Sequence, residues 1–248
     1  MLSKRIIPCL LLKDHQLVKT TQFKNPKYIG DPCNTIRIFN ELEVDELIIL
    51  DINSHSKNHE INYSLLKDIA TEAFMPMGYG GGIRTLDQAR KIFEIGYEKI
   101  IINSLIISSP DTIKKIVDEF GSQAVVASVD YKNKFFNKKN YVYINSGNTN
   151  TGILVLDYCK NLINLGIGEI FLTSINREGT WLGFDLDTIK NVEKHINVPL
   201  IAHGGCGSEE DINTLLKLDI CSLGIGSLVV YSKKDKGVLV NMPNIFNV

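Results

Sequence analysis

Two glycine pairs are the residues whose type and position most directly suggest chemistry in this sequence. Gly81-Gly82 lies in the run MGYGGGI and Gly204-Gly205 in the run IAHGGC, and the pairs are 123 positions apart. Glycine has no side chain, so a ligand oxyanion can approach the backbone N–H groups, and a helix that begins just beyond adds its positive end. Each pair therefore predicts a cradle for a phosphate group.

A second segment completes each predicted cradle. Asn103-Ser104 follows the first pair and Gly226-Ser227 follows the second, and the two serines are again 123 positions apart. A self-match at one fixed spacing is the signature of an internal duplication. The same spacing relates Glu46 to Glu169, Ile52 to Ile175, Asn53 to Asn176, and Pro76 to Pro199. We expect cradles on opposite sides of one site, and a small molecule with a phosphate at each end. The alternative is that the glycines only permit tight turns.

Asp130, which ends the run AVVASVD, is the predicted general acid or base. A carboxylate that only caps a loop is the alternative. Alignment of IIPCLL with VVASVD sets Leu11 opposite Asp130, and a leucine cannot transfer a proton. Asp14, His15 and His203 are candidates to replace the missing acid, although a solvated loop explains Asp14 and His15 better.

Four charged residues are expected at the opposite end of the same strands. Side chains alternate along a strand, so Arg5 shares a face with Leu11, and the same parity directs Glu46, Lys99 and Glu169 inward. Two cations and two anions can satisfy one another as a ring, which is how buried charge is tolerated. The spacing leaves open whether such a ring is a structural plug or has a function.

The elements that position these residues follow from apolar patterning. Short β-branched runs alternate with longer amphipathic runs, which is typical of strand–helix units around a parallel sheet. Strands are expected at 4–11, 46–51, 75–80, 99–103, 123–130, 169–174, 199–203 and 220–225. Helices are expected at 31–42, 63–73, 85–95, 109–120, 151–165, 185–195 and 208–216.

Eight strands in two matching halves predict an α/β fold, namely a (β/α)8 TIM barrel that forms a single domain over residues 1–248. In such a barrel the functional residues are expected at the C-terminal ends of the strands. The half-barrels are expected at about 1–120 and 121–231, with a tail at 232–248. An open doubly wound sheet is the alternative, but its halves would not match glycine for glycine. A hairpin is expected at 132–146, and the eighth outer helix is expected to be reduced or lost because Gly, Asn and Pro follow Tyr231.

Composition excludes several classes of function. The chain has 248 residues, 44% of them hydrophobic, which is enough for a large core. Its net charge of -1 provides no field for nucleic acid or an anionic membrane. Five scattered cysteines suit reduced thiols better than disulfides or a metal site, so we expect no metal and no cofactor. No apolar run approaches a signal peptide or a membrane span, so a cytoplasmic protein is expected.

Several segments resemble a known family. They are RIIPCL at Arg5, DELIILDI at Asp45, GGGI at Gly80, FGSQAVV at Phe120, NTGIL at Asn150 and LTSINREGT at Leu172. Together they resemble the HisF-type cyclase subunit of imidazole glycerol phosphate synthase, over essentially residues 1–231. The resemblance implies a barrel that takes ammonia from a separate HisH-like glutaminase subunit at its N-terminal face. It implies that this ammonia is used on a bisphosphorylated ribonucleotide.

The resemblance also implies roles for individual residues. Asp130 matches one of two catalytic aspartates, and the ring of Arg5, Glu46, Lys99 and Glu169 matches the gate through which ammonia enters. The substrate- or phosphate-binding positions so indicated are Lys19, Gly81, Gly82, Asn103, Ser104, Ser146, Gly147, Asn176, Gly179, His203, Gly204, Gly205, Gly226 and Ser227.

The chain departs from the family pattern at functional positions. Leu11 stands where the family has its other catalytic aspartate, and His203 precedes the second glycine pair where the family has a small residue. The family's DRDGT loop reads Asn176, Arg177, Glu178, Gly179, Thr180, and the stretch 25–28 and the tail also differ. With these changes the chain resembles a divergent paralogue rather than the histidine-pathway enzyme. Such paralogues are found beside glutaminase-like and sugar amidotransferase proteins, where ammonia is used to build amidino sugars of surface polysaccharides.

Three hypotheses follow from this pattern. The leading one is a barrel subunit that passes ammonia on for amidino-sugar synthesis, with a sugar amidotransferase as a further partner. The second is an active cyclase of histidine biosynthesis in which another acid replaces the missing one. The third is a non-catalytic scaffold that activates a glutaminase.

Overall fold

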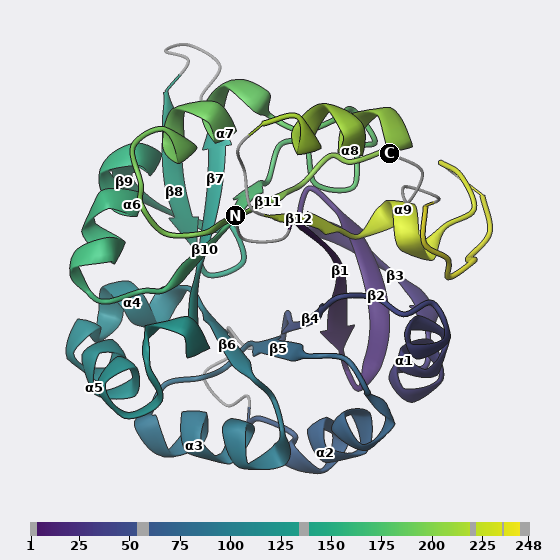
Figure 1. Ribbon diagram of the computed structural model, residues 1–248, viewed down its shortest axis with the longest axis horizontal. Coiled ribbons are helices and arrows are strands. Elements are labelled where there is room, and N and C mark those ends of the chain that lie inside the picture. The colour runs from purple at the N-terminus through teal and green to yellow at the C-terminus, as the bar shows by residue number, and fades with distance from the viewer. Residues whose placement is uncertain (1–3, 54–59, 134–138, 219–221, 235, 244–248) are drawn as a thin grey trace.

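Eight parallel strands close into a barrel in the computed structural model, which describes residues 4–53, 60–133, 139–218, 222–234 and 236–243 (Figure 1). Pairing of β10 (Glu169–Ser174) with β7 (Val125–Asn133) closes the ring, with Thr173 opposite Asp130. The predicted (β/α)8 barrel is confirmed. Its strands are β1 (Arg5–Lys13), β4 (Leu47–Asp51), β5 (Met77–Gly80), β6 (Lys99–Ile102), β7 (Val125–Asn133), β10 (Glu169–Ser174), β11 (Leu200–His203) and β12 (Ser222–Ile225).

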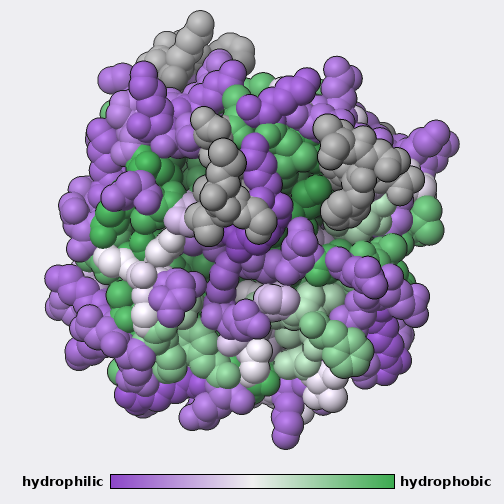
Figure 2. Space-filling view, in the orientation of Figure 1, coloured by the Kyte–Doolittle hydropathy of each residue, from purple (hydrophilic) through white to green (hydrophobic). Residues whose placement is uncertain are grey.

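Amphipathic helices surround the barrel (Figure 1). In α3, Ala89 and Ile92 are three positions apart and both buried, and Thr85 begins the helix with a capping box. Hydrophilic residues predominate around the rim of the face in Figure 2, over the outer helices. The long helices are α1 (Pro32–Glu41), α2 (Tyr63–Glu72), α3 (Leu86–Ile95), α5 (Pro110–Phe120), α6 (Val155–Asn164), α7 (Leu186–Glu193) and α8 (Glu209–Leu216). Shorter turns are α4 (Ser104–Ser108), η1 (Ser122–Ala124) and α9 (Ser227–Val230).

Strand alternation divides the apolar side chains into two cores. The larger core lies between the sheet and the helices. The smaller one fills the barrel and consists of Ile7, Cys9, Ile48, Ile101, Val126, Phe171 and Ile201, with Leu50 packed against it. The prediction of which side chains of β1, β4, β6 and β10 face the barrel interior is therefore confirmed.

Equivalent glycines in the two halves have equivalent neighbours. A side chain at Gly81 would come within 2.6 Å of the carbonyl oxygen of Asp51, and one at Gly204 within 2.7 Å of that of Ser174. Asp51 and Ser174 are themselves 123 positions apart. Both glycines also have positive φ, so any other residue would be strained. These neighbours explain the repeated glycine, while the division into half-barrels stays a prediction.

Two antiparallel extensions rise from the barrel. The predicted hairpin is present as β8 (Asn140–Ile144) paired with β7, although its turn at 134–138 lies outside the described residues. The third strand, β9 (Thr149–Leu154), was not predicted, so the helix expected from 151 begins instead at Val155. The hairpin of β2 (Gln16–Thr21) and β3 (Lys24–Gly30) was also missed, because β3 is mostly exposed and lacks apolar alternation.

The described part of the tail forms no helix after α9, as predicted for the eighth outer helix. It returns along α9, where the backbone N–H of Leu239 donates to the carbonyl of Val230 at 3.0 Å. Cys9, Cys33, Cys159 and Cys206 are free thiols, and Cys221 lies outside the described residues. Among the helices described here, none is both long and apolar enough to cross a membrane.

Candidate functional site

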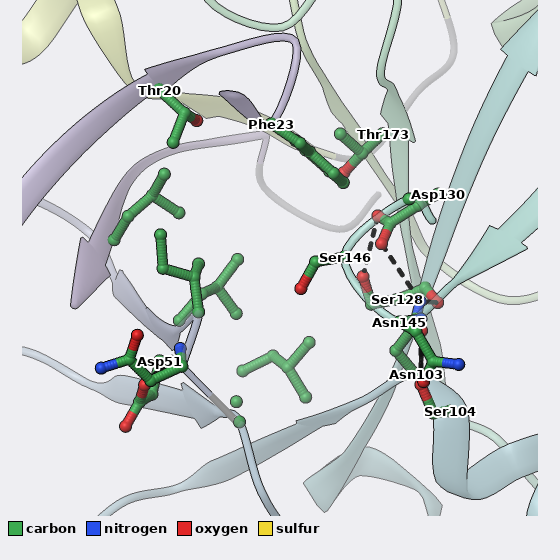
Figure 3. A pocket seen from close by; sticks show the side chains of 18 of the residues that line it. Thr20, Phe23, Asp51, Asn103, Ser104, Ser128, Asp130, Asn145, Ser146 and Thr173 are labelled. Atoms are coloured by element: carbon green, nitrogen blue, oxygen red, sulfur yellow. Dashed lines mark hydrogen bonds between the residues drawn. The ribbon is translucent and has the colours of Figure 1, made fainter. Parts of the chain in front are cut away.

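A cavity of about 710 Å³ opens at the C-terminal ends of the barrel strands. Figure 3 shows Asp130, Ser128, Asn103 and Asn145 gathered on one side of it, with Asp51 on the other. Strand ends at this face of a barrel are where TIM-barrel enzymes place their functional residues. We call this space the mouth cavity.

Asp130 is buried in the wall of the mouth cavity, three residues before the end of β7. Its carboxylate accepts hydrogen bonds from Ser128 Oγ at 3.2 Å and from Asn103 Nδ2 at 3.1 Å. Burial raises the pKa of Asp130 to about 7, against the opposing effect of hydrogen bonds from Ser128 and Thr173. A carboxyl group that titrates near neutral pH can both accept and donate a proton, which suits a general acid or base.

The first predicted cradle opens directly into the mouth cavity. Gly81, Gly82, Asn103 and Ser104 all line it, at the ends of β5 and β6. The backbone N–H of Asn145 donates to Ser104 Oγ at 3.3 Å, so the turn between β8 and β9 is tied to this cradle. Ser146 and Gly147 of that turn also line the cavity. Residues of the barrel and of this turn therefore line the same part of the cavity.

The second predicted cradle lines a second, smaller space at the ends of β11 and β12. Gly204, Gly205, Gly226 and Ser227 line a separate space of about 10 Å³, together with Gly179. Lys19, Glu178 and His203 border both this space and the mouth cavity. These three side chains, which we call the partition, separate the second cradle from the cavity.

The charged pair of the partition is firmly held. Lys19 and Glu178 are both buried and form an ion pair, and Lys19 Nζ also donates to the carbonyl of Thr20 at 3.0 Å. Glu178 accepts two further hydrogen bonds, from Thr20 Oγ1 at 3.1 Å and from the backbone N–H of Phe23 at 3.0 Å. A buried pair with its remaining sites satisfied holds one geometry.

His203 completes the partition as a neutral ring. It stacks on Phe171 with ring centroids 4.9 Å apart, and its Nδ1 is 3.2 Å from Thr173 Oγ1. Burial, with the nearby charge of Lys19, lowers the pKa of His203 to about 3. The ring therefore carries no positive charge at neutral pH that could attract a phosphate.

The four predicted ring residues meet at the opposite end of the barrel. Lys99 Nζ donates to Glu46 at 2.9 Å and to Glu169 at 2.8 Å, and Arg5 bridges the same two carboxylates. Arg5 Nε also donates to Ser222 Oγ at 3.0 Å. The carboxylates are buried and the cations partly exposed, so this gate ring is accessible from outside through its cations.

Comparison with known proteins identifies the family. The model of the family described as "Histidine biosynthesis protein" matches residues 5–235. The chain belongs to this family. It is of the HisF type. It is 46% identical over 99% of its length to a Pseudomonas aeruginosa protein named "Putative imidazole glycerol phosphate synthase subunit hisF2", covering 98% of that relative.

Two further relatives support the HisF assignment. A Leptospira borgpetersenii protein named "Putative imidazole glycerol phosphate synthase subunit HisF" is 45% identical over 98% of the chain and 96% of the relative. "Imidazole glycerol phosphate synthase subunit HisF" of Streptococcus mutans is 41% identical over 85% of the chain and 83% of the relative. The chain is therefore a HisF-type subunit of the cyclase kind.

Some predicted residues are not gathered in the cavity of this HisF-type barrel. Asp14 and His15 form the exposed turn between β1 and β2, where Asp14 accepts from Asn53 Nδ2 at 2.6 Å and His15 Nε2 contacts Asn62 at 3.1 Å. Neither lines the mouth cavity, so the structure does not support them as replacements for the missing acid. Asn176 is exposed and does not line it either, since its side chain accepts from the backbone of Asn133 at 2.9 Å.

Leu11 does line the mouth cavity, on β1 across the barrel from Asp130 on β7. It presents an apolar side chain where the resemblance expects a carboxylate. Other cavity residues were not proposed as site residues from the sequence, namely Asp51, Ser128, Lys132, Asn145 and Thr173, and Glu178 was named only as a departure from the family pattern. Asp51 gave a usable signal, because it ends a predicted strand as Asp130 does.

Proposed function

We propose that this chain is the barrel subunit of a glutamine-dependent amidotransferase system. It receives ammonia from a HisH-like glutaminase at its N-terminal face and delivers it to the mouth cavity. The observation that carries the proposal is the gate ring, which closes the barrel at the end opposite the cavity. Charged groups at that position serve no purpose in binding a ligand at the far end.

The barrel interior supports the proposal by offering ammonia an apolar path. Above the gate ring lie Ile7, Ile48, Val126 and Ile201 of the inner core. Four members of the same cluster also line the mouth cavity, namely Cys9, Leu50, Ile101 and Phe171. Neutral ammonia can cross such a layer, whereas ammonium would lose its hydration without compensation. The path therefore favours ammonia released at the gate over ammonium from solution.

Amidino-sugar synthesis is the use of ammonia that we propose, with a sugar amidotransferase as the further partner. The support is the resemblance described above together with Leu11, which removes one proton-transferring group from the cavity. A second candidate is the cyclase reaction itself, favoured by the pKa of Asp130 near 7. A scaffold role, in which the chain only activates the glutaminase, is compatible with the gate ring but leaves the built cavity unused.

Charge reversal at the gate tests the docking face. Lys99→Glu should weaken co-purification with a HisH-like glutaminase by at least about tenfold, because it replaces an accessible cation by a third carboxylate. Lys114→Glu, an equally drastic change on the exposed face of α5, should leave binding unchanged. Glutamine hydrolysis by the glutaminase should rise on mixing with wild type and not with Lys99→Glu. Equal binding by all three chains would contradict the proposal.

A further inference from the structure

Lys132 is a half-buried cation in the wall of the mouth cavity, and it forms no ion pair with a carboxylate of the described residues. It continues the row of cavity-lining side chains on β7 beyond Ser128 and Asp130. Its Nζ donates to the carbonyl of Gly147 at 2.6 Å and lies 4.6 Å from the centre of the Tyr143 ring. An ammonium group has three N–H donors, so donors remain for a further acceptor.

Burial without a counter-charge is unfavourable for this ammonium group. Burial, with the nearby charge of Lys24, lowers the pKa of Lys132. A backbone carbonyl and an aromatic ring replace only part of the hydration that is lost. Lys19, in contrast, has a counter-charge, because it forms an ion pair with Glu178. An anionic ligand in the cavity would supply the charge that Lys132 lacks.

The carbonyl that Lys132 binds belongs to a turn between β8 and β9 with an unusual backbone. Asn145, Ser146 and Gly147 all have positive φ, at 55°, 54° and 76°, which is unfavourable for the two residues that have side chains. Such a turn persists when its surroundings hold it. Lys132 holds one end of the turn, and Ser104 Oγ holds the other by donating to Asn145 Oδ1 at 3.1 Å. Figure 3 shows Asn145 beside Ser104, with Ser146 pointing into the cavity.

The first predicted cradle consists of uncharged residues, namely Gly81, Gly82, Asn103 and Ser104. We propose that Lys132 supplies the cation of this cradle and binds a phosphate group of the ligand with the N–H donors that remain free. A hydrogen bond from a charged donor to phosphate is stronger than one from a neutral donor. The inference deepens the proposed function and rests on it only in taking the mouth cavity as a ligand site.

Titration of the full isotope-labelled chain with inorganic phosphate, followed by NMR of the backbone amides, tests the proposal. The amide of Ser104 reports on the first predicted cradle and that of Ser227 on the second, so each titration contains its own control. In Lys132→Met, the phosphate affinity measured at Ser104 should fall at least about tenfold, because a charge-assisted hydrogen bond is lost. The affinity measured at Ser227 should stay within about twofold of the wild-type value, because that site is independent.

Lys132→Gln separates the charge from the bond to the turn. Glutamine keeps an N–H donor for Gly147 but has no charge, so this variant should lose affinity as Lys132→Met does. Lys132→Arg keeps the charge and should stay within about threefold of wild type. Lys24→Met removes another lysine of the cavity wall, which is exposed on β3, and it should also stay within about threefold because salt screens an exposed charge.

Three results would overturn the inference. Wild-type affinity at Ser104 in Lys132→Gln would mean that Lys132 only holds the turn, and an equal loss in Lys24→Met would mean that the attraction is diffuse. The third is a wild-type chain whose Ser104 amide does not respond to phosphate. The titration needs no glutaminase, so a chain that binds phosphate through Lys132 but binds no glutaminase would retain this inference and lose the proposed function. The converse result would do the opposite.

Discussion

At the scale of single residues, the site combines a carboxyl group that is costly to ionise with a leucine that cannot ionise. Asp130 is buried and satisfied by Ser128 and Asn103, yet its pKa is raised to about 7. Leu11, on the strand across the barrel, makes the opposite side of the cavity apolar. Asp130 was predictable because it ends the strand expected at 123–130. The ion pair of Glu178 with Lys19 was not predictable, because it joins residues that are 159 positions apart in the chain.

Asp130→Asn should stabilise the fold in a pH-dependent manner. The folded-state pKa is raised above the value of about 3.9 expected for an unfolded chain, so the wild type loses stability as pH rises from about 4 to 7. Asparagine removes that cost, and the variant should be more stable than wild type by about 1–3 kcal/mol at pH 8. Urea unfolding should show the difference shrinking towards zero near pH 4. A variant less stable than wild type at pH 8 would contradict the account.

At the scale of elements, strand alternation explains how one strand can serve both ends of the barrel. β1 carries Arg5 at the gate ring and Leu11 at the mouth, and β10 likewise carries Glu169 and Thr173. This pattern was predictable because the inward period of two is fixed by the backbone. The two extensions were harder to predict, since β3 has one buried residue and β9 has none, so neither strand shows apolar alternation in the sequence.

Breaking the gate ring should destabilise the strands that share it. Glu46→Gln leaves Arg5 and Lys99 to compete for Glu169, and we expect a loss of about 1–3 kcal/mol of unfolding free energy, because one carboxylate is removed from a mostly buried network. The control is Glu98→Gln, an exposed carboxylate next to Lys99, which should change stability by less than about 0.5 kcal/mol. Equal stability of the two variants in urea would show that the ring is held by other contacts.

At the scale of the whole molecule, one barrel has a charged ring at the N-terminal ends of its strands and a cavity of about 710 Å³ at their C-terminal ends. The closed barrel could be predicted from the sequence, because eight short apolar runs alternating with amphipathic helices are typical of a closed parallel sheet. The grouping of Lys19, Glu178 and His203 could not, since these residues come together only when β2, β11 and the segment after β10 pack. Family membership therefore does not by itself give the reaction of this chain.

The most direct test of this account is ammonia-dependent turnover of the bisphosphorylated ribonucleotide by the isolated wild-type chain. One member of a cooperating acid/base pair typically contributes about 10²- to 10⁴-fold, and Leu11 stands where the second proton-transferring group is expected. We predict turnover at least about 100-fold below that of the Streptococcus mutans HisF relative assayed in parallel, with a gain of activity in Leu11→Asp. Wild-type turnover within about tenfold of that relative would contradict the account and identify the chain as an active cyclase.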